Sequence, residues 1–568
     1  MKSRPVKRYL SLIAIIIFSC LAIFSPDLMG SPDVALAGIF RDDMLLLKSE
    51  AARQDFGGPG MAPSNHPERK DIGTVVSSSD PTNPVKTIIT TDKNIKMSVI
   101  PGIKGYYRAQ GWIPVQFILE NSGPAVNGHI EVIINGPEGN LPFIIHRKRL
   151  DLPTGARKRA ELTVLIEQPS FKVRYVSKDK TLLQTSLNLR WAEPNLNIVG
   201  VLTGEDSNMT FFKDVVSAKK GSQLAVFNDP ADLPENDLGL SSLDVLIING
   251  ISTQDLATGR KKAILNWLRD GGTLIVGGGP DAAKVISGLP SNIIPVKIGA
   301  SEALQNLPPS LNLTNGYTGR GPYIYSAVKR YQGKIILGDS KAPYAISKDV
   351  GKGRVIWLAF DLGARPFSEW RGNDKFWNRI ISYRANNRQG INNPYNPWYG
   401  PLSGLLFNIP ALKAPPLSMV LAFLFLYLIL ISPLNYFVLK KFDKREWAWI
   451  TIPVFIAIFG VSSYWYAYIK KGGDVIINQI GVIEASPNEA DAKIYNLFGI
   501  FSPGKRSYDI KIPKDMFGSP TPGNYYGGPM VALDPAIMNQ ESQAEISDFS
   551  IAAWTMRSFL TTGRIELK

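Results

Sequence analysis

Residues that could do chemistry follow two apolar runs in the middle of the chain. Glu205 and Asp206 come directly after the run LNIVGVLTG, which ends at Gly204, and Asp361 follows the run VIWLAF. Open α/β sheets bind ligands at such strand ends, where two carboxylates could act as an acid/base pair or hold a hard cation. Acidic residues at these positions also cap helices or lie in solvated loops. We therefore treat all four residues as ligand-binding candidates and not as catalytic ones.

A serine and a glycine run mark two further strand ends. Ser252 follows the Asn-Gly pair that closes DVLIING and is the nearest feature to a nucleophile elbow. However, GIS is not G-x-S-x-G and no base stands beside it, which favours a plain turn serine. Gly277, Gly278 and Gly279 follow TLIV and could offer backbone N–H groups to an anion. They lack the Lys-Ser/Thr of a P-loop, so a tight turn is the favoured interpretation.

Cysteine and histidine are scarce. Cys20 is the single cysteine, and none of the three histidines lies beyond His146. A Cys-His or Ser-His-Asp arrangement therefore cannot form from residues after position 146 alone. We predict a non-enzymatic protein with no catalytic residues, no metal site and no cofactor.

The candidate residues need a sheet to position them. From about residue 193 to 388, apolar strands alternate with helical stretches such as TGRKKAILNWLRDGG, which places Ala263, Ile264, Trp267 and Leu268 on one face. This alternation predicts a doubly wound α/β domain with a parallel sheet covered on both faces.

The flanking regions carry strand patterns. Short runs with period-two alternation and Gly/Pro turns predict an immunoglobulin-like β-sandwich over residues 95–192. Residues 470–568 predict a smaller β-rich domain that ends on the strand-like RIELK. The open edge of a terminal strand would need a partner or the first sandwich to cover it.

Two apolar stretches between the α/β and C-terminal regions predict a transmembrane hairpin. Residues 417–439 and 447–469 each reach about 35 Å as a helix, enough to cross a hydrocarbon core of ~30 Å. The turn between them, KKFDKRE, is basic, and short basic loops stay in the cytoplasm. Both flanks of the hairpin should then lie outside the cell.

The N-terminus predicts export. Basic residues precede an apolar run, and Ala35-Leu36-Ala37 offers a cleavage site. A lipidated Cys20 and an uncleaved anchor are alternatives. The predicted order is a signal peptide 1–37, a linker 38–94, the sandwich 95–192, the α/β domain 193–388, a juxtamembrane linker 389–416, a helix 417–439, a cytoplasmic turn 440–446, a helix 447–469 and the β-rich domain 470–568.

Several motifs resemble a known group of proteins. DVLIING, NWLRDGGTLIVGGG, GKGRVIWLAFD and the hairpin sequence SPLNYFVLKKFDKREWAWITIP resemble bacterial membrane-anchored proteins with an extracytoplasmic class I glutamine-amidotransferase-like domain. The resemblance covers most of the chain from residue 95 and implies an amidotransferase/flavodoxin-like fold. The catalytic Cys and His of active amidotransferases are absent, so the resemblance implies a catalytically silent domain.

The net charge and the predicted topology limit the possible functions. A net charge of +15 suits anionic lipids or anionic polymers, and an exported chain does not meet nucleic acid. We expect a multi-pass cell-membrane protein whose large domains are extracytoplasmic and bind or assemble an envelope protein or polysaccharide, with an undetermined oligomeric state. The alternative is a carboxylate- or metal-dependent hydrolase acting on an envelope substrate.

Overall fold

The computed structural model describes most of the chain from residue 88 onward. The described residues are 47–48, 88–92, 94–108, 111–136, 142–192, 197–204, 212, 223–307, 320–370, 372–382, 402, 404–406, 416–471, 474–485, 491–521 and 534–567. The predicted signal peptide with Cys20, most of both predicted linkers, and the candidates Glu205 and Asp206 lie outside these residues.

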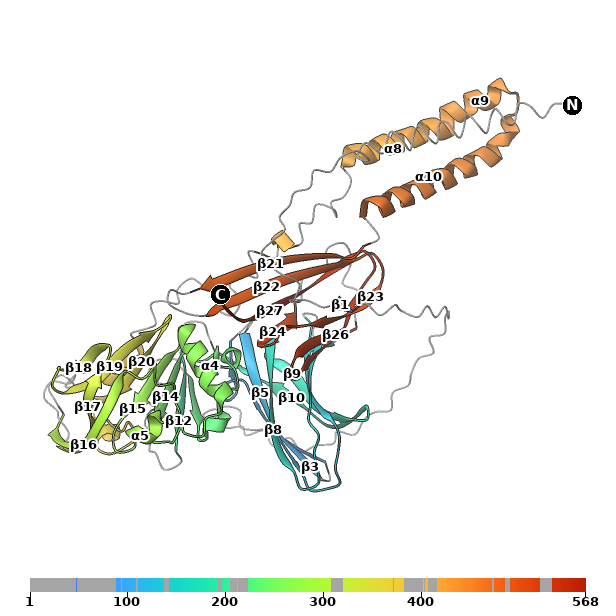
Figure 1. Ribbon diagram of the computed structural model, residues 1–568. Helices are drawn as coiled ribbons and strands as arrows, with labels where there is room; N and C mark the ends of the chain where they lie inside the picture. The colour runs from blue at the N-terminus through green and yellow to red at the C-terminus, as the bar shows by residue number, and fades with distance from the viewer. Residues whose placement is uncertain are drawn as a thin grey trace. The chain divides into compact units, whose positions relative to one another are not determined.

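The central part of the chain forms a seven-stranded sheet (Figure 1). In spatial order its strands are β13 (Gln223–Phe227), β12 (Ile198–Thr203), β14 (Val245–Asn249), β15 (Thr273–Gly277), β20 (Gly353–Leu358), β19 (Pro343–Val350) and β18 (Lys334–Gly338). The first five strands pair in parallel, whereas β19 and β18 pair antiparallel. Strands β12, β14 and β15 are buried along their whole length, as strands covered on both faces must be, whereas the edge strand β13 is partly exposed.

The predicted doubly wound α/β fold is wrong. Of the described residues, 50% lie in strands and 23% in helices. The described helices of this region are α3 (Asp237–Leu240), α4 (Thr258–Arg269), α5 (Ala282–Ile286) and α6 (Asn373–Ser382), and two of them have five residues or fewer. Between β15 and β20 the chain forms β16 (Val296–Asn306), β17 (Arg320–Tyr331), β18 and β19, where the prediction had a helix-and-strand alternation. Helix α4 does connect the parallel strands β14 and β15, but between β15 and β20 antiparallel strands occupy much of the stretch where a doubly wound sheet would have crossover helices.

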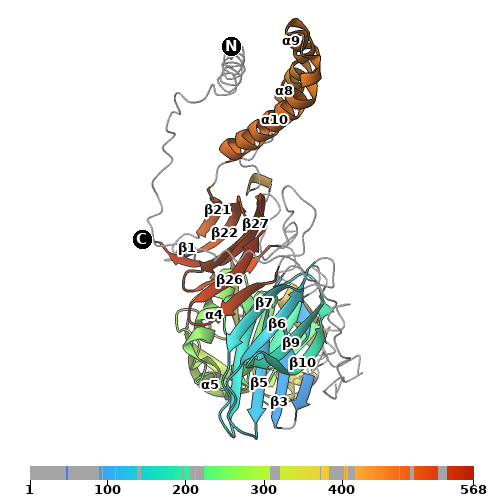
Figure 2. The same ribbon diagram turned by 90° about the vertical axis from the view of Figure 1, so that its right-hand side faces the viewer.

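Residues 88–192 contribute to two further sheets. One is four-stranded, in the order β2 (Ile88–Asp92), β3 (Ile95–Pro101), β5 (Gly111–Asn121) and β8 (Arg157–Ile166). The other contains β7 (Pro142–Arg149), β6 (His129–Asn135), β9 (Ser170–Ser177) and β10 (Lys180–Asn188), which run side by side in Figure 2. A short parallel pair joins β4 (Tyr106–Tyr107) to β11 (Arg190–Trp191).

The larger of these two sheets is completed by the C-terminal region. Strand β7 pairs in parallel with β25 (Ala536–Gln540), with Ile145 opposite Ile537. The sheet then continues through β26 (Ala544–Ile551) and β23 (Arg506–Lys511) to β1 (Leu47–Lys48), giving eight strands. The prediction of a self-contained immunoglobulin-like sandwich followed by a separate β-rich domain is therefore wrong. The strand that pairs with β7 is not the terminal strand predicted at RIELK, which lies inside another sheet with a neighbouring strand on each side and is not an edge strand.

The remaining C-terminal strands form a four-stranded antiparallel sheet. Its order is β21 (Ile476–Ala485), β22 (Asp491–Ser502), β27 (Thr555–Glu566) and β24 (Met516–Pro520). Leu497, Phe501 and Leu560 of this sheet pack in one apolar cluster with Trp112 of β5 and Leu406. Residues before and after the predicted hairpin thus share a core.

The two apolar stretches form helices. The first comprises α8 (Leu417–Ile429), a π-helical turn η5 (Leu430–Leu434) that contains a proline, and α9 (Asn435–Lys441). The second comprises η6 (Arg445–Trp447) and α10 (Ala448–Lys471). Both helices are long and apolar enough to cross a membrane. Phe459 packs against Tyr427 with ring centroids 5.1 Å apart, so the helices contact each other as a hairpin.

Candidate functional site

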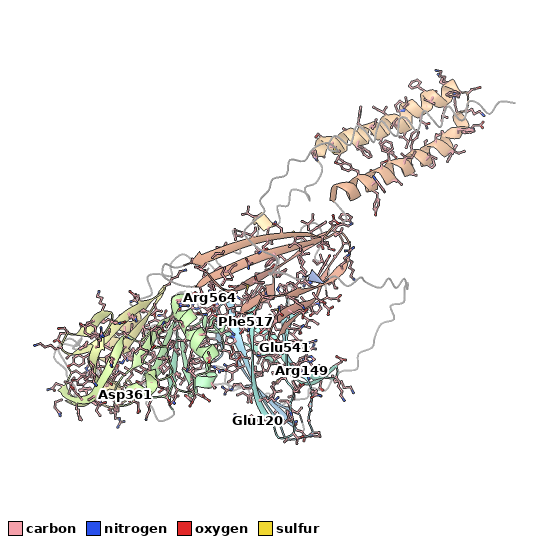
Figure 3. All side chains as sticks on the ribbon, viewed as in Figure 1. Glu120, Arg149, Asp361, Phe517, Glu541 and Arg564 are labelled. Atoms are coloured by element: carbon pink, nitrogen blue, oxygen red, sulfur yellow. The ribbon has the colours of Figure 1, made fainter. Side chains whose placement is uncertain are left out.

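The carboxyl ends of four parallel strands meet at one edge of the seven-stranded sheet. Thr203 at the end of β12 lies opposite Asn249 of β14, and Gly277 of β15 lies opposite Leu358 of β20. Gly204, the glycine run and Asp361 follow these strand ends, and Figure 3 labels Asp361. The structure therefore brings Asp361 and the glycine run together, whereas Gly204 lies beside Gly250, in the turn that leads to Ser252.

Asp361 holds the backbone of its own loop. Its Oδ1 accepts hydrogen bonds from Asn249 Nδ2 at 2.8 Å and from the Gly363 N–H at 3.0 Å. Asn249 is fully buried, and its Oδ1 accepts from the Leu362 N–H at 3.0 Å. The Asp361–Asn249 pair thus ties the end of β14 to the loop after β20. This arrangement has the character of a loop cap more than of an acid or base facing a substrate.

The glycine run is required by close packing. Gly278 N–H donates to the Phe360 carbonyl and Gly279 N–H to the Ala359 carbonyl, each at 2.9 Å. A Cβ on Gly277 would lie 2.1 Å from Asn249 Oδ1, and one on Gly278 would lie 2.3 Å from the Ala359 carbonyl oxygen. Two of the amide groups offered as anion donors are therefore already paired. The tight-turn interpretation describes this segment, and the anion site loses its donors.

Ser252 is a turn residue. It is exposed, and its Oγ accepts from the Gln254 N–H at 3.3 Å, a local side-chain turn. The neighbouring Thr253 is buried, donates to the Val285 carbonyl at 2.7 Å and accepts from the Gly288 N–H at 2.9 Å. Among the hydrogen bonds of the described residues, none gives Ser252 a base.

Glu205 and Asp206, the other carboxylates that the sequence offered for this site, lie outside the described residues. Within the described part of the chain, no three His, Cys, Asp or Glu residues gather closely enough to hold a metal ion. Sequence reasoning missed the role of Asn249, whose only signal was its place in the Asn-Gly pair. It also missed Thr203, whose buried Oγ1 has no hydrogen-bond partner among the residues that the structure describes.

Glu161 is a buried carboxyl with a pKa near neutrality. It lies on β8, where its oxygens accept from Gln116 Nε2 at 3.1 Å and from the Glu235 N–H at 3.0 Å. Burial, followed by the nearby negative charge of Glu235, raises the pKa of Glu161 to about 7. Its contacts join the four-stranded sheet to the segment before α3. No period or motif distinguishes this glutamate in the sequence.

Two sets of contacts connect residues before the hairpin with residues after it. The first set is centred on Gln540, and we call it the pairing joint. Gln540 Oε1 accepts from the Thr163 N–H at 3.0 Å, and its Nε2 donates to the Thr163 carbonyl at 2.7 Å. The same Nε2 lies 3.0 Å from Nδ1 of the fully buried His146. Because the Thr163 N–H can only donate, it fixes the amide orientation, and His146 Nδ1 must accept. Glu541, labelled with Arg149 in Figure 3, extends the joint by accepting from the Arg149 N–H at 2.7 Å.

The second joint is ionic and connects the end of α4 with β22 and β27; we call it the ionic joint. Arg269 lies 2.8 Å from Asp491, and Lys493 lies 2.9 Å from Asp270. Arg564, labelled in Figure 3, contacts both of these aspartates. Burial, with the nearby Asp270, raises the pKa of the adjacent Asp237 carboxyl. This is a charge network between segments separated by the hairpin.

The comparisons with known proteins are limited to part of the chain. A family model described as a domain of unknown function, DUF8726, matches residues 94–190. This match lies within the two sheets built from residues 88–192 and does not touch the α/β region. A search of curated proteins finds no match.

Solved structures resemble the chain only distantly. A cytoplasmic protein from Salmonella typhimurium is 15% identical at a TM-score of 0.27, covering 33% of this chain and 98% of that protein. An exo-β-1,4-mannosidase from Opitutaceae bacterium strain TAV5 is 13% identical at a TM-score of 0.25, covering 34% of this chain and 36% of the mannosidase. At these scores neither likeness carries an argument about function.

Proposed function

We propose that this protein is a membrane-anchored binding or assembly protein of the bacterial envelope. The observation that carries the proposal is the pairing of β7 with β25, because these strands lie on opposite sides of the hairpin in sequence. Residues before the hairpin and residues after it thus form one folded body. The hairpin serves as its tether, and the body presents sheet surfaces to a protein or polysaccharide partner.

The pairing supports this topology. Two strands of one sheet cannot lie on opposite sides of a bilayer, which favours a hairpin whose two ends face the same compartment. Asn478 Nδ2 donates to the Leu406 carbonyl at 2.7 Å, which links the segments just before and just after the helices. The basic turn with Lys440, Lys441 and Lys444 favours the cytoplasm for the turn and the exterior for the body.

The contacts at these strand ends count against catalysis there. Asp361 caps a loop, the amides of Gly278 and Gly279 are paired, and Ser252 has a local turn contact. A hydrolase would need a base or a metal centre in addition to these residues. The alternative hydrolase function thus depends on Glu205 and Asp206 together with Asp361.

Cysteine labelling tests the topology. Ser252 and Ser542 are both exposed, and they lie before and after the hairpin. In a Cys20→Ser background, Ser252→Cys and Ser542→Cys should both react with a membrane-impermeant thiol reagent in intact cells. Lys444→Cys should react only after the cells are opened. Labelling of Lys444→Cys in intact cells, or of only one of the two serine variants, would overturn the proposed arrangement.

Substitution of the candidate residues at the strand ends tests whether the protein has a catalytic function. Asp361→Asn keeps the Oδ1 acceptor for Asn249 and Gly363, so the loop should keep its fold. Combined with Ser252→Ala and with Glu205→Gln and Asp206→Asn, it should restore a deletion strain as fully as the unmodified protein. Failure of this variant at normal protein abundance would favour the hydrolase alternative.

A further inference from the structure

Strand β21 forms one edge of the four-stranded C-terminal sheet. In the described part of the chain only β22 pairs with it, from Ile476 opposite Phe501 to Ala485 opposite Ala492, without a bulge. The strand has 10 residues, whereas about 5 to 6 is usual. Its outer edge therefore presents a long, regular row of backbone N–H and C=O groups, which is a template for another strand.

The opposite edge strand of the same sheet, β24, is protected against pairing with a further strand, whereas β21 is not. Strand β24 has 5 residues and ends in Pro520, and both features limit pairing with a further strand. The sequence of β21, IINQIGVIEA, contains no Lys, Arg or Pro. Its single charge, Glu484, has Lys352 Nζ at 3.1 Å. The usual devices against edge pairing are therefore missing from β21.

The side chains of β21 alternate between two environments. Ile476 and Ile480 pack against the apolar cluster that contains Leu406. On the other face, Ile477 is 44% exposed and Ile483 is 45% exposed. These two isoleucines flank Gln479 and Gly481, so the exposed face is apolar at both ends and uncharged between them.

We propose that β21 pairs antiparallel with β21 of a second copy of this chain, about a two-fold axis at Ile480. Residues opposite each other in an antiparallel pair share a face. In this register the exposed Ile477 of each copy lies opposite the partner's Ile483, and Glu484 lies opposite the partner's Ile476. The four-stranded sheets of two copies become one continuous eight-stranded sheet.

Two observations favour a second copy as the occupant. The pattern is self-complementary, because one register covers both exposed isoleucines and keeps the two glutamates apart. In addition, β21 begins shortly after α10 ends at Lys471. Copies anchored in one bilayer hold this strand at the same height above it, which raises the effective concentration of one edge for the other.

Cross-linking of the full chain in its native membrane tests the pairing. In a Cys20→Ser background, Ile480→Cys places two thiols opposite each other at the two-fold axis, within reach of a short bifunctional thiol reagent or a disulfide. The expected result is a dimer band at twice the mass of the chain. Val482→Cys is the matched control, because its thiols would lie roughly 13 Å apart along the strand and should give little dimer.

A charge exchange tests the register. Adding Ile477→Lys and Ile483→Lys to the Ile480→Cys variant places lysine opposite lysine in both cross-strand pairs, and the dimer band should be lost. Ile477→Lys with Ile483→Glu instead places lysine opposite glutamate, and the band should return. Both side chains are exposed in the single chain, so the melting temperature of each variant in detergent should stay close to that of the unmodified protein.

Three outcomes would overturn the proposal. The first is equal dimer formation at positions 480 and 482, the second is no dimer at either position, and the third is a cross-link from Ile480→Cys to a protein of another mass. Loss of the dimer in both charge variants would exclude the register about Ile480.

Discussion

The pairing joint and the ionic joint connect the same two regions by different physical means. At the pairing joint, Gln540 satisfies a backbone N–H and C=O of β8, and His146 lies beside it as a neutral ring. At the ionic joint, Arg564 and Lys493 meet Asp270 and Asp491. One joint is built from uncharged hydrogen bonds between two sheets, and the other from charges that must remain charged.

This difference predicts different sensitivities. A buried neutral histidine opposes protonation, because the charged ring loses its hydration and presents a donor to the Gln540 amide. A buried ion pair is destabilised most when one partner is removed, since the other charge is left without compensation. Acid should therefore act first on the pairing joint, and charge removal on the ionic joint.

Acidification should have the largest effect. Burial lowers the pKa of His146 to about 3 from the ordinary value of 6.5. The unfolded chain binds this proton and the folded chain does not, so stability present above pH 6.5 is lost as the pH falls toward 3. At about 1.4 kcal/mol for each pKa unit, the loss is on the order of 5 kcal/mol. Urea unfolding at a series of pH values, followed by hydrogen exchange of β25, measures it.

The His146→Asn variant is the control for acidification. It removes the titrating ring, so β25 should show a weaker loss of protection in acid. Glu161 acts in the opposite sense, because its raised pKa favours the folded state as the pH falls from about 7 toward 4.5. The difference between the unmodified protein and His146→Asn removes this contribution. An equal acid response of the two proteins would contradict the role given to His146.

Charge removal should be the next largest effect. Arg564→Met leaves Asp270 and Asp491 with fewer positive partners in a joint where the arginine side chain is only 10% exposed. Because Lys493 still pairs with Asp270 and Arg269 with Asp491, we expect a cost of about 3 kcal/mol, the lower end of the range for a buried charge that loses its partner. Urea unfolding and hydrogen exchange of β27 measure it.

Lys262→Met is the matched control for the ionic joint. Lys262 also pairs with a C-terminal acid, Asp515 at 3.3 Å, but both side chains are about 60% exposed. Exposed pairs contribute about 0 to 1 kcal/mol, so this variant should unfold close to the unmodified protein. Similar losses for Arg564→Met and Lys262→Met would show that burial does not set the strength of this joint.

Loss of the amide at the pairing joint should have the smallest of the three effects. Gln540→Ala leaves the N–H and C=O of Thr163 without these partners, at a cost of about 2 to 3 kcal/mol. Gln543→Ala is the control, since Gln543 makes one longer contact of 3.4 Å with the Ile512 carbonyl. Hydrogen exchange of β25 and β8 should increase for Gln540→Ala alone. Unchanged protection would place the strength of this joint in its apolar side chains.

Local patterns predicted the local features. The apolar stretches at 417–439 and 447–469 were assigned from composition alone, and helices with membrane-spanning length occupy them. The strand ends at Gly204, Gly277 and Asp361 were also found, because buried parallel strands are continuous apolar runs. In contrast, the antiparallel strand β16 is largely exposed and β17 is buried at only a few positions, so neither offered a comparable apolar signal.

Features that depend on distant residues were not predictable. The pairing of β7 with β25 is fixed by a register between segments almost 400 positions apart, and each strand alone is compatible with many neighbours. Asp361 was located correctly at the sheet edge, but its role depends on Asn249, which lies on another strand. For the same reason neither His146 nor Gln540 carried a signal of the joint that they form.

The pairing of β7 with β25 also has a consequence for the order in which the sheet is assembled during synthesis. His146 and Gln540 are separated by 394 positions, so at a synthesis rate of about 5 to 20 residues per second β7 is made roughly 20 to 80 s before its neighbour. During that interval the edge of β7 that will pair with β25 has no neighbour from its own chain. The eight-stranded sheet can therefore be completed only after the helices have been synthesised.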